Sequence, residues 1–281
     1  MSENKTDKNS DEPITFYEQN YSFRKKYKSF IEIAIIIYIL ISIAFIKILL
    51  IATENKSDKS KISQILININ PGNKYTHCII WLHGLGDRPE NMVDFFTKDI
   101  IINKLNSTKI ILLRAPLMKM TYYYKNKKLT SWFDIFSFPL NSRDKYNFED
   151  AKRSSNFLRN IIEKEANILG DYQKIFIGGF SQGACISLFT ALNFEKLLGG
   201  VIACSGFLFE QTEIIGNKKI LNIYIGHGDK DKIIPLDFHK ETIKRIEEYE
   251  GVKKYYYNGS GHSINKNEKK DIEKFLNALI T

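Results

Sequence analysis

A serine with a glycine two residues before it and another two residues after it is the part of this sequence most typical of an enzyme. Ser181 follows a short β-branched and aromatic run, 174–178, and precedes a stretch without Pro or Gly, 184–192, that predicts a helix. A serine in a sharp turn between a strand and a helix is a nucleophile elbow, which exposes its hydroxyl at the edge of a sheet. The same turn points the backbone N–H of Gln182 toward a substrate. The alternative is a Gly-rich turn with an idle serine, and the flanking strand and helix argue against it.

A nucleophilic serine needs a base that takes its proton and an acid that orients the base. In proteins with this elbow, the acid and then the histidine follow the serine along the chain. His262 stands between the candidate acids and the last predicted helix and, of the five histidines, it alone lies there in a Gly-rich loop after a strand-like run. Two carboxylates, Asp229 and Asp231, compete for the role of the acid. We expect Asp229 to bond to the backbone of its own loop, as residues in Asx turns do.

A second backbone N–H is needed to stabilise an oxyanion, and it comes from a loop after an early strand. Residues 81–87, Trp-Leu-His-Gly-Leu-Gly-Asp, end a predicted strand at two glycines that let the backbone approach a substrate. An ordinary glycine turn is the alternative. Cys78, Cys185 and Cys204 lie in apolar stretches without the spacing of a disulfide framework or a zinc site. We therefore expect them to be core residues, and we expect no metal.

The chain has 281 residues, of which 43% are hydrophobic, and a net charge of +9. This length allows one large α/β domain and an additional segment. The lysines are scattered among Asn and Ile and form no basic stripe beside a nucleic-acid-binding motif. We therefore expect no nucleic-acid partner.

Strands and helices alternate from residue 62 onward. The expected strands are 62–69, 77–82, 109–113, 174–178, 200–204, 219–225 and 252–257, and the expected helices are 90–104, 148–169, 182–194, 236–250 and 268–280. Apolar strands separated by helices predict a mostly parallel sheet that helices cover on both faces.

The N-terminal part of the chain has a different composition. Residues 1–29 are polar and are expected to form a disordered tail, and residues 53–61 form a charged linker. Within 30–52, residues 33–52 form a mainly apolar run of twenty positions with a single charge, a lysine near the far end, which predicts a single transmembrane signal anchor. A buried core helix and a cleaved signal peptide are the alternatives. Four basic residues precede the segment and three follow it closely, so the side of the membrane that the domain 62–281 faces stays undetermined.

Seven short motifs occur in one order along the chain. They are Leu82-His-Gly-Leu-Gly-Asp87, Arg114-Ala-Pro116, Ser131-Trp-Phe-Asp134, Gly178-Gly-Phe-Ser-Gln-Gly183, Ser205-Gly206, His227-Gly-Asp-Lys-Asp231 and Gly261-His-Ser263. Together they resemble the acyl-protein thioesterase family, also called the phospholipase/carboxylesterase family, of α/β-hydrolases. The resemblance covers about residues 73–281.

The resemblance implies the α/β-hydrolase fold, with Ser181 as nucleophile, His262 as base and Asp231 as the orienting acid. It also implies an oxyanion hole made of the N–H groups of Leu85 and Gln182. The implied reaction is hydrolysis of thioesters or oxyesters of long-chain acyl groups, without metal or cofactor.

Three hypotheses follow for the function. The first is a membrane-anchored serine hydrolase that removes acyl groups from S-acylated proteins. The second is a carboxylesterase or lysophospholipase that acts on small acyl esters or acyl-ester lipids. The third is an inactive binding module tethered to a membrane. Trp132, Phe133 and Phe136 could line an acyl pocket, and they could equally be core aromatics.

Overall fold

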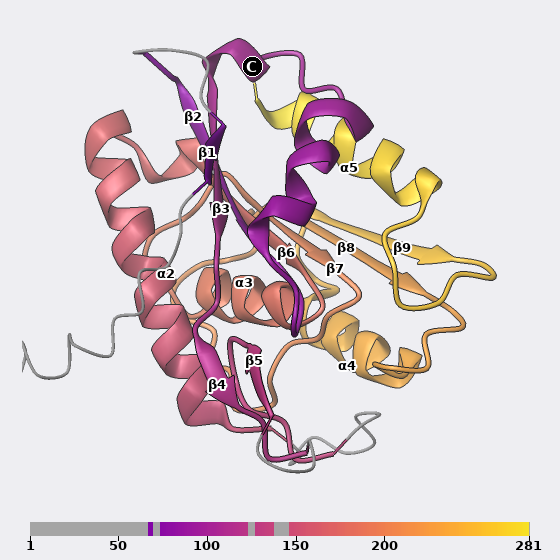
Figure 1. Cartoon of the computed structure of the whole chain (residues 1–281). Helices are drawn as coiled ribbons and strands as arrows, with labels where there is room; N and C mark the ends of the chain where they lie inside the picture. Colours follow the sequence, from indigo (N-terminus) through magenta and orange to yellow (C-terminus); the bar gives the residue numbers. More distant parts are fainter. Residues whose placement is uncertain (1–66, 70–73, 123–126, 138–145, 281) are drawn as a thin grey trace, which may run out of the picture. The chain divides into compact units, whose positions relative to one another are not determined.

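The computed structural model describes residues 67–69, 74–122, 127–137 and 146–280 of the chain (Figure 1). The expected tail 1–29, the apolar segment within 30–52 and the linker 53–61 all lie outside the described residues. Within the described ranges, no helix combines the length and the apolar character that crossing a membrane requires.

The described strands of the main sheet follow the order β1-β3-β2-β6-β7-β8-β9 (Figure 1). β1 is antiparallel to β3, and the other neighbouring pairs are parallel. The strands are β1 (Ile67–Ile69), β2 (His77–Leu82), β3 (Thr108–Leu113), β6 (Ile175–Phe180), β7 (Gly200–Cys204), β8 (Ile223–Gly228) and β9 (Val252–Tyr257). Because β2 and β6–β9 are parallel, the loops that follow them gather at one edge of the sheet, where sites in such folds lie.

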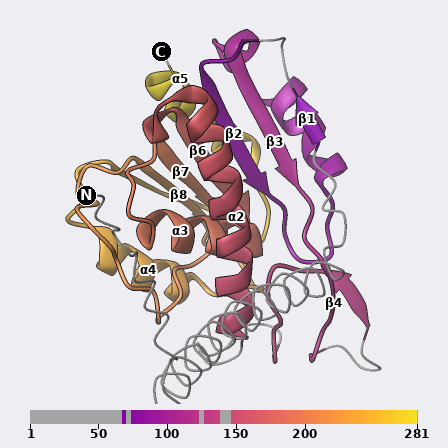
Figure 2. The same ribbon diagram turned by 90° about the vertical axis from the view of Figure 1, so that its left-hand side faces the viewer.

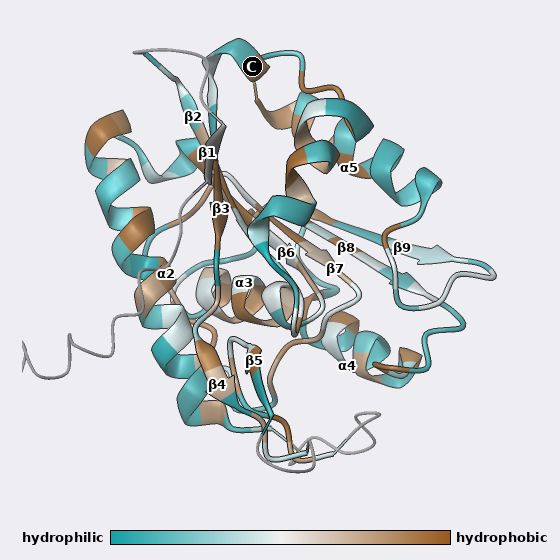
Figure 3. Ribbon diagram, in the orientation of Figure 1, coloured by the Kyte–Doolittle hydropathy of each residue, from teal (hydrophilic) through white to brown (hydrophobic). Residues whose placement is uncertain are grey.

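Helices pack against both faces of this sheet (Figures 1 and 2). On one face, α2 (Phe148–Leu169), α3 (Gln182–Leu192) and α4 (Leu236–Ile246) share a core with Ile80. On the other face, α5 (Lys266–Leu279) shares a second core with Trp81. Figure 3 shows the hydrophobic residues concentrated in the central strands and hydrophilic stretches along α2 and α5. The sequence prediction of a mostly parallel sheet with two covered faces is confirmed.

One expected helix, 90–104, does not form as predicted. A short 3₁₀ helix, η1 (Pro89–Met92), and one π-helical turn, η2 (Phe95–Asp99), take its place, and the chain is extended from Ile100. Ile100 and Ile102 are buried whereas Ile101 is 68% exposed. Burial of alternate residues requires an extended backbone rather than a helix. The N–H of Ile101 donates to Oε2 of Glu273 in α5 at 2.9 Å. A side chain of α5 thus holds the extended segment against the helix.

The short hairpin of β4 (Leu117–Lys119) and β5 (Lys128–Thr130) was not predicted. Each strand has three residues, Leu-Met-Lys and Lys-Leu-Thr, and a run of that length is too short to show an alternation of apolar and polar residues. A 3₁₀ turn, η3 (Leu105–Ser107), leads into β3, and another, η4 (Tyr172–Lys174), leads into β6. The hairpin matters for function because its last residue, Thr130, bonds to the loop that follows β2.

Candidate active site

Ser181 occupies the turn between β6 and α3 in a backbone conformation that residues other than glycine rarely adopt, with φ 55° and ψ −119°. Its N–H donates to the carbonyl oxygen of Cys204 in β7 at 2.9 Å. A Cβ atom at Gly179 would lie 2.5 Å from the carbonyl carbon of Gly183 and 2.6 Å from the oxygen of Leu82. The turn therefore requires glycine where the sequence has it.

His262 lies between Ser181 and Asp231. Its Nε2 is 2.9 Å from Ser181 Oγ, and its Nδ1 is 2.6 Å from Asp231 Oδ2. An ionised carboxylate only accepts hydrogen bonds, so Nδ1 carries the ring proton and Nε2 is left to accept the proton of Ser181. The Phe180 ring packs on the imidazole with 4.8 Å between ring centroids. The structure thus brings these three predicted residues together, in the arrangement that nucleophilic catalysis by serine requires.

Asp231 is held as an anion by its surroundings. Its Oδ1 accepts hydrogen bonds from the N–H groups of Ile233 at 2.8 Å and Ile234 at 3.0 Å. Burial by itself would raise its pKa, but the hydrogen bond and charge of His262, together with these two N–H groups, lower the pKa below the usual value. Asp229 differs from the expectation, because its Oδ1 accepts from the N–H of Gly259, in the loop that carries His262.

His227 is a residue of this site that sequence reasoning did not single out for a role. Its side chain is fully buried, and its Nε2 donates to the carbonyl oxygen of Ile234 at 2.9 Å. The same nitrogen lies 3.4 Å from Asp231 Oδ2. Burial lowers the pKa of His227, so the ring is neutral while it closes the loop around Asp231. The available signal was its place at the start of the motif that ends in Asp231.

The two expected oxyanion donors lie on either side of the serine. Gln182 is the first residue of α3, so its N–H has no acceptor within the helix. Gly84 is packed against Ser181, since a Cβ added to Gly84 would lie 3.4 Å from the Ser181 Cβ. Leu85 follows directly, before Gly86 in the left-handed region with φ 74°. Within the described residues, neither the Leu85 N–H nor the Gln182 N–H donates a hydrogen bond, so both can serve a substrate oxygen.

The aromatic residues considered for an acyl pocket are placed mainly in the core. Trp132 and Phe133 are each 1% exposed. Phe133 packs edge-on against Phe209 at 5.2 Å between ring centroids. Such buried rings present almost no surface to a substrate, so the structure favours the core alternative for both, whereas Phe136 is 43% exposed.

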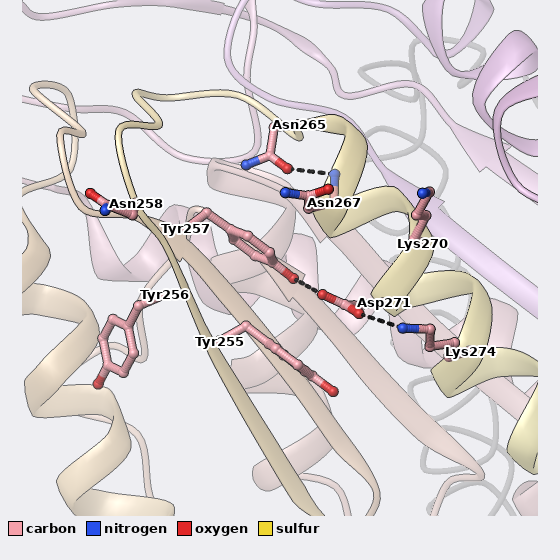
Figure 4. A pocket seen from close by; sticks show the side chains of 9 residues that line it. All are labelled: Tyr255, Tyr256, Tyr257, Asn258, Asn265, Asn267, Lys270, Asp271 and Lys274. Atoms are coloured by element: carbon pink, nitrogen blue, oxygen red, sulfur yellow. Dashed lines mark hydrogen bonds and ion pairs between the residues drawn. The ribbon is translucent and has the colours of Figure 1, made fainter.

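Other groups that could react are inert or lie elsewhere. The three cysteines are free thiols buried in the core, and burial raises the pKa of the Cys185 thiol to about 12. Among the residues that the structure describes, no three His, Cys, Asp or Glu side chains are grouped to hold a metal ion. A surface pocket lies beside β9 and α5 and is lined by residues such as Tyr257 and Asp271 (Figure 4). Ser181, Asp231 and His262 are not among its lining residues.

A mostly parallel sheet with a serine elbow, a hydrogen-bonded histidine and aspartate, and two free N–H groups beside the serine defines an α/β-hydrolase of the serine type. The sequence pattern of the phospholipase/carboxylesterase family matches residues 64–280, and the chain belongs to this family. The chain is therefore a hydrolase.

Two curated relatives illustrate the likeness. Acyl-protein thioesterase 1 of Debaryomyces hansenii is 34% identical over 214 residues, covering 72% of this chain and 90% of the relative. Acyl-protein thioesterase 1 of Candida albicans is 29% identical, covering 78% of this chain and 98% of the relative.

Solved structures share the fold. A single-residue variant of SOBER1 from Arabidopsis thaliana is 25% identical, with a TM-score of 0.67, covering 73% of this chain and 99% of that one. Acyl-protein thioesterase 2 of Zea mays, at 21% identity and a TM-score of 0.63, covers 77% of this chain and 99% of that one, and it supports the fold alone.

Proposed function

We propose that this chain is an acyl-protein thioesterase that removes long-chain acyl groups from S-acylated proteins through an acyl-enzyme on Ser181. The observation that carries the proposal is the hydrogen-bonded series from Ser181 through His262 to Asp231, with distances of 2.9 Å and 2.6 Å. The relatives named as acyl-protein thioesterases, which match over most of their own length, support this class of substrate.

The proposed reaction begins when Ser181 Oγ attacks the acyl carbon and its proton moves to His262 Nε2. The carbonyl oxygen becomes an oxyanion, which the N–H groups of Leu85 and Gln182 stabilise. The C–S bond then breaks, and the departing cysteine thiolate takes the proton from His262. A water molecule attacks the acyl-serine with His262 again as base, which releases the fatty acid and restores the serine.

We also propose that residues 33–52 anchor the chain in a membrane as a single span. The support is the sequence alone, which offers twenty positions with one charge near the end. An anchored enzyme would be held beside substrates whose acyl chains already lie in the bilayer, and tethering raises the effective concentration of a reaction partner.

The substrate class is tested by measuring turnover per active site on three substrates: a palmitoylated peptide, a lysophospholipid and a short-chain ester. We expect the thioester of the palmitoylated peptide to have the highest kcat/KM. Cleavage of the short-chain ester alone would contradict the proposed substrate and favour a carboxylesterase. A preference for the lysophospholipid would favour an acyl-ester lipid. Failure to cleave any of them would favour a binding module.

The anchor is tested separately, by extracting membranes that contain the full chain with alkaline carbonate. We expect the full chain to stay in the membrane pellet and a variant without residues 1–61 to be released. Release of the full chain would contradict the anchor. Protease treatment of intact vesicles then determines the side of the membrane on which the hydrolase domain lies.

A further inference from the structure

Residues 130–133, here called the bridging segment, bond both to Gln182 at the start of α3 and to the loop after β2 that carries Leu85. On one side the bridging segment bonds to the side chain of Gln182. The Gln182 Oε1 accepts from the Trp132 N–H at 3.0 Å and from Ser131 Oγ at 2.9 Å, and the Gln182 Nε2 donates to the Phe133 carbonyl at 2.8 Å. The residue that supplies one donor N–H is thus fixed through its side chain.

On its other side the bridging segment bonds to the loop that follows β2. The indole Nε1–H of Trp132 donates to the carbonyl oxygen of His83 at 2.8 Å. The carbonyl of Thr130 accepts from the Gly86 N–H at 2.8 Å, and the Thr130 hydroxyl donates to the Asp87 carbonyl at 2.7 Å. These bonds enclose Leu85, which supplies the other donor.

The His83 side chain strengthens this connection. Its Nε2 accepts from the Ala115 N–H at 3.1 Å, so the ring proton is on Nδ1, which donates to the Gly84 oxygen at 2.7 Å. Burial lowers the pKa of His83, which keeps the ring neutral. The Trp132 ring lies 5.5 Å from the His83 ring between centroids.

Trp132 is the one residue of the bridging segment that donates to both sides, with its backbone N–H to Gln182 and its indole N–H to His83. We propose that Trp132 is a positioning residue that sets the distance between the two oxyanion N–H groups. The inference rests on the proposed function, because it concerns the oxyanion hole of that reaction.

The physical reason is preorganisation. Oxyanion donors act when they already point at the place where charge develops, and a misplacement of about 1 Å can cost orders of magnitude in rate. Trp132 is 1% exposed, so both of its hydrogen bonds lie away from water, where hydrogen bonds are stronger and the loss of a partner is costly. Loss of either bond would let the loop after β2 and the start of α3 move apart without changing a group that touches the substrate.

The test compares Trp132→Phe with Trp81→Phe. The two tryptophans are both 1% exposed, but the Trp81 Nε1 has no hydrogen-bond partner among the described residues. The control therefore removes the same atoms from the core without breaking a hydrogen bond. Active sites are counted by complete labelling with a fluorophosphonate, and kcat, KM and the inhibition constant of an acyl trifluoromethyl ketone, which forms a tetrahedral adduct, are then measured.

We expect Trp132→Phe to lower kcat per labelled site by roughly 10- to 100-fold, less than removal of a donor itself, with KM little changed. The inhibition constant of the ketone should rise by the same factor, and Trp81→Phe should change neither. A Trp132→Phe enzyme with fewer labelled sites but a normal kcat per site would overturn the inference, because it would show a purely structural role.

Should Trp132→Phe fail to fold, Gln182→Met separates the bridging segment from the elbow while it keeps the Gln182 N–H, and the same signature is expected. A normal kcat per site in that variant would overturn the inference as well. Ser181→Ala separates a failure of the proposed function from a failure of the proposed role of Trp132. Turnover by Ser181→Ala contradicts the proposed function, whereas an inactive Ser181→Ala with normal kcat in Trp132→Phe contradicts the inference alone.

Discussion

Asp231, and not its neighbour Asp229, accepts the hydrogen bond of the His262 ring, with 2.6 Å between Oδ2 and Nδ1. Asp229 instead accepts from the backbone N–H of Gly259 at 2.7 Å, three residues before His262. Both carboxylates therefore contact the loop that carries His262. Asp231 bonds to the imidazole, and Asp229 bonds to the backbone of that loop.

Asp231→Asn is expected to lower kcat by about 10⁴ with KM little changed, because an amide in this position favours the wrong tautomer of the histidine. The matched variant Asp229→Asn should keep kcat within about tenfold, a barrier change near 1.4 kcal/mol. Steady-state kinetics on one acyl thioester measures both. The reverse order of the two variants would mean that the orienting acid has been assigned to the wrong aspartate.

We expect Glu268 to make the stability of the fold depend on pH. Its side chain is 1% exposed, and Oε1 has no hydrogen-bond partner among the described residues. Burial raises the pKa of Glu268 from 4.5 to about 7, against the hydrogen bonds from the Cys204 thiol and the Asn265 N–H that lower it. Because the folded-state pKa is the higher one, its contribution to stability is fully present below pH 4.5 and is lost as the pH rises to about 7.

Glu268→Gln keeps the shape and the capping interaction but cannot ionise. At pH 8 we expect the variant to be more stable than the wild type by up to about 3 kcal/mol, and this difference should shrink as the pH falls toward 5. Urea unfolding of both proteins across this pH range gives the comparison. A difference that does not vary with pH would show that Glu268 does not titrate in this range.

Gly183→Ala is expected to prevent stable folding, because the new Cβ atom would collide with the backbone of Leu82 in β2. Gly259→Ala is the control, since Gly259 has φ 76° and no atom within 4 Å of the added Cβ. It should cost only the penalty of a left-handed conformation, about 1–2 kcal/mol. Thermal unfolding of the two variants tests this, and equal melting temperatures would be incompatible with the close contact at the elbow.

Deletion of residues 1–61 should leave an active hydrolase. The family match begins at residue 64, and among the residues that the structure describes, all members of the two cores follow residue 74. Turnover per labelled site on a water-soluble thioester should equal that of the full chain in detergent. An inactive, aggregated truncation would mean that the N-terminal part contributes to the folded domain.

The sequence predicts the fold well where apolar residues recur with a single spacing, that of a helix or that of a strand. Residues 148–169 form α2 with the predicted bounds, because an uninterrupted helical pattern ends at Gly170, which has φ 71°. The prediction failed in the second half of 90–104, where hydrogen bonds from the Ile101 and Asn103 N–H groups to side chains of α5, far away in the sequence, hold the chain extended. Local patterns do not contain that information.

The candidate site divides in a similar way. Ser181 and His262 could be proposed from their motifs and their order along the chain, because both the strained turn and the loop require glycines that are visible in the sequence. The separate roles of Asp229 and Asp231 depend on which group each carboxylate contacts, the backbone N–H of Gly259 or the imidazole of His262, and this is a property of the folded chain. Trp132 was considered for an acyl pocket because aromatic residues suit both roles, and its two hydrogen bonds are visible only in the structure.

The most direct test of the proposed function is mass spectrometry of the acyl-enzyme. The protein is mixed with a palmitoylated peptide, quenched with acid within the first turnover and digested. We expect one palmitoyl group in ester linkage on the peptide that contains Ser181, with release of the free peptide thiol, and no such adduct in Ser181→Ala. A palmitoyl group on another residue, or thiol release by Ser181→Ala at the wild-type rate, would contradict the proposed function.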